Sequence, residues 1–322
     1  MVVVLLVSCQ RPGRRLGSWL ALLTAAVALA ACGSSSTSTS AHAASTAAAA
    51  SRASGGGTAS GRGTVNVLYA ASLEQLIDTR IAPAFDRLTG YTLAGYPAGS
   101  TDLASEIKSG VRRGDVFISA AADVNRALEG AGNGDWVSWY APFATTSLVI
   151  GYNPRSSFAG ALRTQPWYRV IARPGFRLGF TDPRLDPKGA LTVAALRAAA
   201  VRYHDPALLR IASDQSDLFP EQDLVGRLQA GQLDAGFFYT VEAAAAHIPT
   251  VPITPIHGYA TYTITVLNRA PDARGAAAFV RFLLGPAGRA QLRAVGLAAV
   301  SRPVAIGAGV PASLRDLIAE RG

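Results

Sequence analysis

Carboxylates stand at two predicted helix starts in this sequence, and each could do more than begin a helix. In the segment 180-FTDPRLDPKGAL-191, Asp186 precedes a proline where an apolar stretch meets an alanine-rich one, and Glu221 follows a proline farther along. An acid in a first helical turn is stabilising by about 0.3–1 kcal/mol through the helix dipole. Carboxylates are also ligands that hard metal centres favour. Asp182 ends the preceding strand and is the weaker ligand candidate, because we expect it to close a turn.

Hydroxyl side chains directly follow two predicted strands. Ser72, with a glutamine three residues later, has the spacing of a capping box, and Ser100 or Thr101 has the same place after residues 92–96. These residues either cap their helices or belong to an anion site. In such a site, unpaired backbone N–H groups and the positive end of the helix dipole face the ligand.

The elements that must position these residues alternate along the chain from residue 65 onward. Strand-like and helix-like stretches alternate, which is typical of an α/β fold with mainly parallel sheets. We expect strands at 65–70, 92–96, 115–120, 147–152, 177–181, 234–239 and 260–266. We expect helices at 72–89, 101–110, 121–130, 188–203, 221–230, 240–247 and 272–295.

The first sixty residues differ from the rest. Three arginines precede an apolar run that ends at Ala31, and small residues stand ahead of Cys32. This pattern is typical of a lipoprotein signal peptide. We expect residues 1–31 to be removed, a lipid to be attached at Cys32, and residues 32–63 to form a flexible Ser/Ala/Thr/Gly tether. An uncleaved N-terminal anchor is the alternative.

Composition narrows the possible function classes. The 322-residue chain is 49% hydrophobic and carries a formal net charge of +9, which favours an anionic ligand or surface. Cys9 and Cys32 are the only cysteines, so the folded part has neither a disulfide nor a cysteine nucleophile. The four histidines lack a metal-ligand spacing, and no nucleophile or dinucleotide-binding motif is present. We therefore expect no enzyme activity, cofactor or metal site. Nucleic acid is not an expected partner, because the basic residues are spread rather than clustered.

From about Val65 to Leu297 the chain resembles the solute-binding proteins of ABC importers, in particular the molybdate/tungstate-binding group. The resemblance rests on the segments 70-AASLEQL-76, 98-AGSTDLASEI-107, 115-DVFISAAAD-123, 143-FATTSLVIGYNP-154, 181-TDPRLDPKG-189 and 220-PEQDLVGRLQAGQLDAGFFYTVEA-243. It implies an α/β fold of the periplasmic-binding-protein type II, in which two α/β lobes joined by two crossover strands close on a ligand. The expected crossings lie near residues 145–152 and 252–262. Lobe 1 would comprise residues 64–146 and 260–322, and lobe 2 would comprise residues 147–259.

The resemblance also implies a ligand site. Its expected residues are Ala71, Ser72, Ser100, Asp186, Lys188, Glu221 and Tyr239. In one branch of the family an aspartate and a glutamate approach the metal centre, and Asp186 and Glu221 match these positions. Molybdenum(VI) and tungsten(VI) can take extra oxygen donors, whereas a carboxylate beside sulfate only adds repulsion. Tyr239 would donate its hydroxyl to an oxo group, or be a plain core tyrosine. Lys188 departs from the family pattern, which has a small residue or cysteine here, and would suit a plain oxyanion.

The implied function is a receptor without catalysis. It would stand outside the cytoplasm on its lipid anchor and capture a tetrahedral oxyanion such as molybdate or tungstate. It would deliver this anion, as a monomer, to a membrane permease with its ATPase. Phosphate, sulfate and organic anions stay open as ligands. A sensory or enzymatic module on the same fold is a further alternative, because a fold does not fix a function.

Overall fold

The computed structural model describes residues 62–320. The predicted signal peptide, the predicted lipid attachment at Cys32 and nearly all of the predicted tether lie outside the described residues. None of the helices between residues 62 and 320 has the length and apolar character needed to cross a membrane.

An eleven-stranded mixed sheet runs through residues 62–320. Its strands are β1 (Thr64–Ala70), β2 (Thr92–Ala98), β3 (Val116–Ser119), β4 (Trp139–Tyr152), β5 (Leu178–Gly179), β6 (Ala235–Tyr239), β7 (Thr250–Pro252), β8 (Tyr259–Val266), β9 (Ala298–Ala299), β10 (Val304–Gly307) and β11 (Ala319–Glu320). β1 pairs in parallel with β2 and β3, and β5 pairs in parallel with β6. Every described pair that involves β4 or β8 is antiparallel. The prediction of mainly parallel sheets is therefore wrong in part, because these two long strands run against their neighbours.

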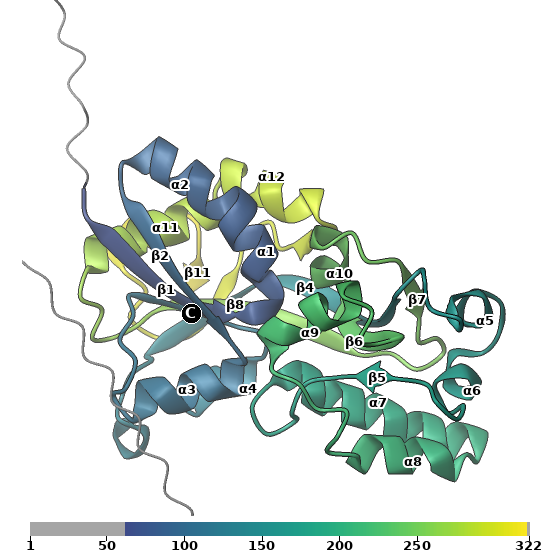
Figure 1. Ribbon diagram of the computed structural model, residues 1–322. Helices are drawn as coiled ribbons and strands as arrows, with labels where there is room; N and C mark the ends of the chain where they lie inside the picture. The colour runs from purple at the N-terminus through teal and green to yellow at the C-terminus, as the bar shows by residue number, and fades with distance from the viewer. Residues whose placement is uncertain (1–61, 321–322) are drawn as a thin grey trace, which may run out of the picture. The chain divides into compact units, whose positions relative to one another are not determined.

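β4 carries the chain from one lobe to the other. Its residues 141–147 pair with β8, and its residues 148–152 pair with β6. The first lobe is built on β1, β2, β3 and β8, and the second is built on β5, β6 and β7 (Figure 1). The predicted α/β fold with two lobes joined by crossover strands is confirmed, and β4 includes the first predicted crossing. The lobe boundaries at residues 146/147 and 259/260 stay a prediction.

Helices cover both faces of the sheet in the first lobe. They are α1 (Glu74–Leu76), α2 (Ala82–Thr89), α3 (Ser100–Lys108), α4 (Ala122–Arg126), α11 (Ala273–Leu284) and α12 (Pro286–Ala294). In Figure 1, α2, α11 and α12 lie on one face, and α3 and α4 lie on the other. Phe85 and Phe279 pack edge to face with ring centroids 5.4 Å apart, while Leu68, Leu103 and Phe117 fill the opposite side. Burial on both faces explains why β1 and β3 are almost wholly apolar.

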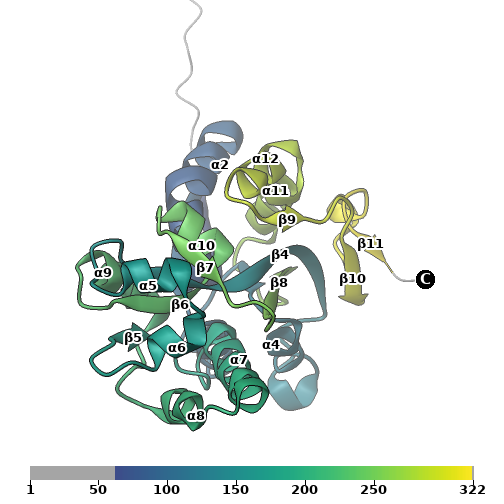
Figure 2. The same ribbon diagram turned by 90° about the vertical axis from the view of Figure 1, so that its right-hand side faces the viewer.

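The second lobe repeats this arrangement. Its helices are α5 (Ala159–Thr164), α6 (Trp167–Ile171), α7 (Pro187–Tyr203), α8 (Pro206–Ser213), α9 (Glu221–Gln229) and α10 (Thr240–Ala245). α7 lies on one side of β6, and α9 and α10 lie on the other (Figures 1 and 2). α9 and α10 both contact the 3₁₀ turn Ala71–Leu73 of the first lobe. The first turns of helices from both lobes therefore meet at one place.

Several elements differ from the predicted ones. The predicted helix 272–295 is two helices, because Pro286 has no backbone N–H with which to continue α11. β4 begins at residue 139 rather than 147, and it buries aromatic residues of the run 136–143. α5, α6, α8, β7, β9, β10 and β11 do not stand among the predicted elements. Most of these are only a few residues long, too short for a periodic pattern to develop.

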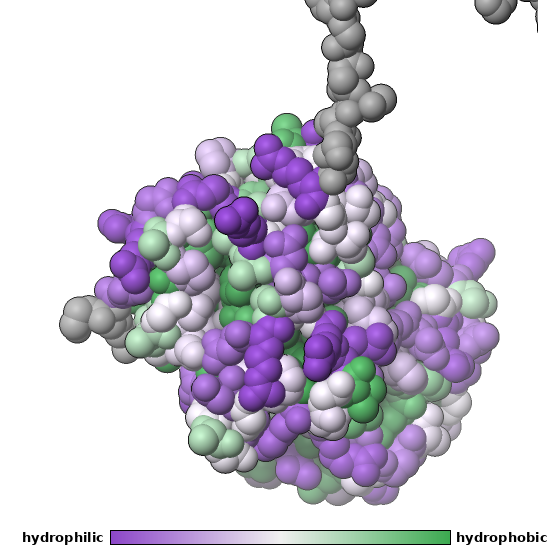
Figure 3. Space-filling model, turned by 90° about the vertical axis from the view of Figure 1, so that its left-hand side faces the viewer, coloured by the Kyte–Doolittle hydropathy of each residue, from purple (hydrophilic) through white to green (hydrophobic). Residues whose placement is uncertain are grey.

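The surface of the first lobe is mixed in character. Figure 3 shows hydrophilic side chains over much of the face turned to the viewer, with apolar side chains in small separate patches. Scattered apolar groups of this kind are normal on protein surfaces.

Candidate functional site

The lobes touch where β2 ends and α7 begins. The backbone N–H of Asp102 in α3 donates to the carbonyl of Leu185, at 3.0 Å. Gly99 permits this approach, because a Cβ there would lie 2.5 Å from the Leu185 oxygen and 3.2 Å from the Asp186 Cβ. Asp186 therefore lies at the boundary between the lobes, beside the first turn of α3.

Asp186 caps α7 with one carboxylate oxygen only. Oδ1 accepts a hydrogen bond from the Lys188 N–H at 3.0 Å, as an N-cap residue does. Oδ2 is buried and has no hydrogen-bond partner among residues 62–320. Burial raises the pKa of Asp186, and the charge of Lys188 opposes that rise. The predicted cap is confirmed, and a second oxygen is left over for another contact.

Lys188 is completely buried in the first turn of α7. Its Nζ donates to both carboxylate oxygens of Glu242, at 3.0 and 2.8 Å, and lies 3.1 Å from Oε1 of Glu221. Burial by itself would lower the pKa of Lys188, but Glu242, Glu221 and Asp186 outweigh it and the pKa is raised. The Lys188 ammonium therefore stays charged inside the protein and faces carboxylates.

Glu221 occupies the first turn of α9 and is 4% exposed. Its contact with Lys188 is an ion pair without hydrogen-bond geometry, and neither carboxylate oxygen finds a hydrogen-bond partner in the described part of the chain. Burial, and then repulsion from Asp186, raise the pKa of Glu221 well above its usual range, against the pull of Lys188. Oε2 can therefore still take another partner, while Oε1 lies against the Lys188 ammonium.

Glu242 belongs to the site and was missed by the sequence reasoning. It is buried in α10, pairs with Lys188, and accepts a hydrogen bond from the backbone N–H of Tyr239 at 3.3 Å. Burial raises its pKa, while Lys188 opposes that rise. The signal that could have found it is an acid three residues after the end of a strand, in an otherwise apolar helix.

Two tyrosines from opposite lobes lie beside this cluster. Tyr239 ends β6 and Tyr262 lies in β8, with ring centroids 6.3 Å apart and planes at 81°. The hydroxyl of Tyr239 is buried without a hydrogen-bond partner in residues 62–320, whereas that of Tyr262 is hydrogen-bonded to Ser72 at 2.8 Å. Burial raises the pKa of both phenols well above the usual value, so both stay protonated. Tyr262 was also missed, because alternation inside an apolar strand marks a core residue equally well.

The two predicted serines make their hydrogen bonds within the first lobe. Ser72 is hydrogen-bonded to Tyr262 rather than capping a helix, and the Ser100 hydroxyl accepts from the backbone N–H of Ala120 at 3.0 Å. Gly99, not Ser100 or Thr101, is the N-cap residue of α3. The capping interpretation of these serines is therefore wrong. Ser72 lies next to the charged cluster, and Ser100 lies one residue from the Gly99 contact with Asp186.

The Asp182 carboxylate is engaged by Arg184 rather than by the cluster, although Asp182 lines a cavity together with Asp186 and Glu221. Its carboxylate accepts from the backbone N–H of Arg184 at 2.9 Å and pairs with the same residue's guanidinium. The predicted turn-closing role is confirmed.

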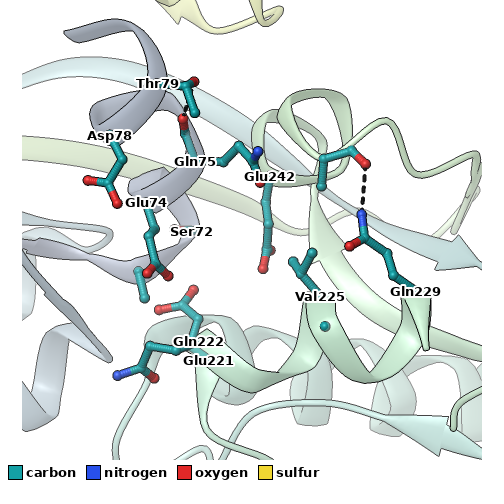
Figure 4. A pocket seen from close by; sticks show the side chains of 13 residues that line it. Ser72, Glu74, Gln75, Asp78, Thr79, Glu221, Gln222, Val225, Gln229 and Glu242 are labelled. Atoms are coloured by element: carbon teal, nitrogen blue, oxygen red, sulfur yellow. Dashed lines mark hydrogen bonds between the residues drawn. The ribbon is translucent and has the colours of Figure 1, made fainter. Parts of the chain in front are cut away.

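Two cavities flank the cluster, and Glu221 lines both. One of about 320 Å³ is bounded by Ala71, Ser72, Glu74, Glu221 and Glu242, among others. Figure 4 shows Glu74 on one side, and Glu221 and Glu242 on the other, extending into it. The second, of about 290 Å³, is lined by Gly99, Thr181, Asp186 and Glu221, with others. Asp186 and Glu221 thus line the space between the lobes, with Asp186 Oδ2 and both Glu221 carboxyl oxygens buried at its wall.

Unpaired buried oxygens define what the site can do. Within residues 62–320 they are Thr181 Oγ1, Asp186 Oδ2, both Glu221 carboxylate oxygens and the Tyr239 hydroxyl. A buried polar atom without a partner costs about 1–3 kcal/mol, so a group of them at one place indicates a bound ligand or water. Three of these oxygens belong to the carboxyl groups of Asp186 and Glu221. In the described part of the chain no group of three or more His, Cys, Asp or Glu residues could hold a metal ion.

Curated relatives share this sequence pattern. The family model described as bacterial extracellular solute-binding protein matches residues 65–298. A Halobacterium salinarum protein named as an uncharacterized solute-binding protein is 33% identical, over 68% of this chain and 80% of its own. A Haloferax volcanii protein, provisionally named an ABC transporter molybdenum-binding protein, is 35% identical, over 59% of this chain and 60% of its own. The molybdate/tungstate-binding protein WtpA of Thermococcus kodakarensis is 24% identical, over 58% of this chain and 67% of its own.

A solved structure has the same fold. The periplasmic molybdate-binding protein of Azotobacter vinelandii superimposes with a TM-score of 0.58 at 20% identity, over 72% of this chain and 98% of its own. At this identity the likeness establishes the fold alone.

Proposed function

We propose that this chain, which belongs to the bacterial extracellular solute-binding protein family, captures molybdate or tungstate between its lobes for an ABC importer. Asp186 and Glu221 complete the oxygen shell of the metal, and Tyr239 donates its hydroxyl to an oxo group. A lipid at Cys32 holds the protein outside the cytoplasm. A permease with its ATPase receives the anion from the monomer.

The unpaired carboxylate oxygens carry this proposal. Asp186, Glu221 and Glu242 together outnumber the single buried cation, Lys188. A fully ionised sulfate offers only acceptors and negative charge to such a site, so its desolvation would find little compensation. A molybdenum(VI) or tungsten(VI) centre is an electrophile, and it can take carboxylate oxygen directly. The names of the Haloferax and Thermococcus relatives support the same ligands.

Isothermal titration calorimetry with four oxyanions tests the proposal. Wild-type protein is titrated with tungstate, molybdate, sulfate and phosphate. We expect heat from the first two, and an at least hundredfold weaker tungstate affinity in Glu221→Gln and in Asp186→Asn. Asp182→Asn is the matched control, because this acid lies in the same loop but pairs with Arg184. Absence of tungstate and molybdate heats from folded protein, or an unchanged affinity in Glu221→Gln, would contradict the proposal.

Phosphate is the competing ligand that the same atoms favour. A protonated phosphate can donate a hydrogen bond to the Asp186 or Glu221 carboxylate, which sulfate cannot do. Tight phosphate binding that weakens in Glu221→Gln, with no tungstate heat, would assign the site to phosphate instead.

The lipid anchor is tested separately from the ligand. Full-length protein expressed in a bacterial host is fractionated, and Cys32→Ser is compared with wild type. We expect wild type in the membrane fraction and the variant in the soluble fraction. Equal distribution of the two proteins would contradict the anchor at Cys32.

A further inference from the structure

Lys188, in the first turn of α7, contacts its two glutamate partners in different ways. The hydrogen bonds and ion pairs described for its Nζ all go to carboxylates of the second lobe, from Glu242 in α10 and Glu221 in α9. Both Glu242 oxygens accept from Nζ, and Glu242 Oε2 also accepts from a backbone N–H. Glu221 Oε1 lies 3.1 Å from Nζ in a buried ion pair, and Glu221 Oε2 has no hydrogen-bond partner in the described residues. Glu242 is therefore engaged on both oxygens, whereas Glu221 keeps Oε2 for another partner.

In this arrangement Glu242 fixes the position of Lys188, and Lys188 in turn positions Glu221. Glu242 fixes the ammonium, because two hydrogen bonds to one carboxylate define its position. The fixed ammonium then attracts Glu221 across a fully buried contact that water does not screen. Without that neighbour, a buried Glu221 would face Asp186 with no cation beside it. Lys188 thus holds Glu221 in place beside the two cavities that this residue lines.

We propose that Lys188 is a positioning residue that makes coordination of a metal oxyanion possible, and that it acts through Glu221 rather than by touching the anion. This inference rests on the proposed function. It assigns Lys188 a role opposite to that of a direct anion binder, because the ammonium protons are already directed to carboxylates. Specificity then follows, since a Glu221 oxygen held beside the cavities can coordinate an electrophilic metal centre, whereas a simple dianion gains nothing from it.

A charge-neutral double variant tests the inference. Lys188→Met with Glu242→Gln removes one positive and one negative side chain, so the net charge of the site is unchanged. The Lys188–Glu242 pair disappears as a unit, so this variant should lose less stability than Lys188→Met, although Glu221 stays buried beside Asp186 without its cation. We expect an unfolding midpoint between those of Lys188→Met and wild type, and a tungstate affinity at least tenfold weaker by calorimetry. If this variant does not fold, Lys188→Gln with Glu242→Gln replaces it with a hydrogen-bonded amide pair of the same net charge.

The same pair of substitutions in a Glu221→Gln background supplies the deciding readout. If Lys188 acts through Glu221, the pair changes the residual tungstate affinity less than twofold there, and the two effects are strongly non-additive. An equal loss in both backgrounds, or a wild-type affinity in the charge-neutral variant, would overturn the role of Lys188. Wild-type protein that binds neither tungstate nor molybdate would overturn this inference and the proposed function together. Normal wild-type binding with an unaffected charge-neutral variant would overturn this inference alone.

Discussion

The buried polar residues on the two sides of the site differ in charge, although Glu74 of the first lobe also extends into one cavity. We define the neutral wall as Ser72, Ser100 and Tyr262 of the first lobe, and the charged wall as Asp186, Lys188, Glu221 and Glu242 of the second. The neutral wall is satisfied by its own lobe, since Ser72 bonds Tyr262 and Ser100 accepts from a backbone N–H. The charged wall leaves three carboxylate oxygens unpaired within residues 62–320.

This difference indicates that the two lobes have different roles in ligand binding. A wall whose hydrogen bonds are already made is rigid and has a fixed shape before the ligand arrives. A wall with buried, unpaired carboxylate oxygens stores an unfavourable energy that a suitable ligand removes. We infer that the neutral wall shapes the site and that the charged wall selects the ligand.

The largest expected effect comes from breaking the charged wall. Lys188→Met leaves Glu242 and Glu221 buried without their cation, which destabilises a protein by about 3–5 kcal/mol. Urea unfolding of wild type and variant measures the difference. Arg184→Ala is the control, because it breaks an ion pair whose arginine side chain is 76% exposed and should cost under about 1 kcal/mol. Equal small losses in both variants would remove the distinction between the walls.

Adding a side chain at Gly99, where the two lobes touch, should have the next largest effect. In Gly99→Ala the new Cβ meets the Leu185 carbonyl of the other lobe, and overpacking of this kind costs about 1–3 kcal/mol. Because this contact joins the two lobes, we expect the substitution to weaken ligand binding. The tungstate affinity should fall roughly ten- to hundredfold. Gly160→Ala in α5 is the matched control, since a Cβ there meets nothing within 4 Å. An unchanged tungstate affinity in Gly99→Ala would show that the lobes need not approach this closely.

The charged wall should also make stability depend on pH. Glu221 and Asp186 have raised pKa values in the fold, so the folded state holds protons that the unfolded chain releases. The unfolding free energy of ligand-free protein should therefore fall as pH rises from the ordinary carboxyl pKa toward the raised values. The slope is at most about 1.4 kcal/mol per pH unit for each proton.

Thermal unfolding between pH 5 and 8 measures this dependence. Burial raises the pKa of Asp217 to about 6, so its contribution ends about one pH unit higher, and measurements above about pH 7 isolate the buried cluster. Glu221→Gln should flatten the curve in that range. A wild-type curve that rises with pH there would contradict the assigned direction.

The smallest effect is expected from the neutral wall. Ser72→Ala removes one hydrogen bond to Tyr262 and should cost about 1 kcal/mol of stability, because the phenol loses its buried partner. Ser72→Ala with Tyr262→Phe removes both partners and should recover most of that loss. Chemical denaturation of the three proteins gives these values. A loss as large as that of Lys188→Met would mean that both walls are equally strained.

Much of the fold was predictable because long elements have strong local patterns. β1, β6, β8, α3, α7 and α9 begin and end within about two residues of their predicted bounds. The Asp186 cap was predictable for the same reason, since an acid before a proline defines a helix start within three residues. The short helices and C-terminal strands were not predictable, because packing against other elements rather than local pattern decides them.

What the sequence by itself determined is the set of elements, the family resemblance and most of the site's residue types. Only the tertiary structure decided the pairing of those residues. The Lys188 contact with Glu242 spans 54 positions, and the Ser72 contact with Tyr262 spans 190. No local pattern specifies such pairs, because each side chain's partner is set by how strands and helices pack after the chain has folded. The surroundings of Glu221, beside Lys188 and two cavities, are therefore a property of the fold and not of any local sequence pattern.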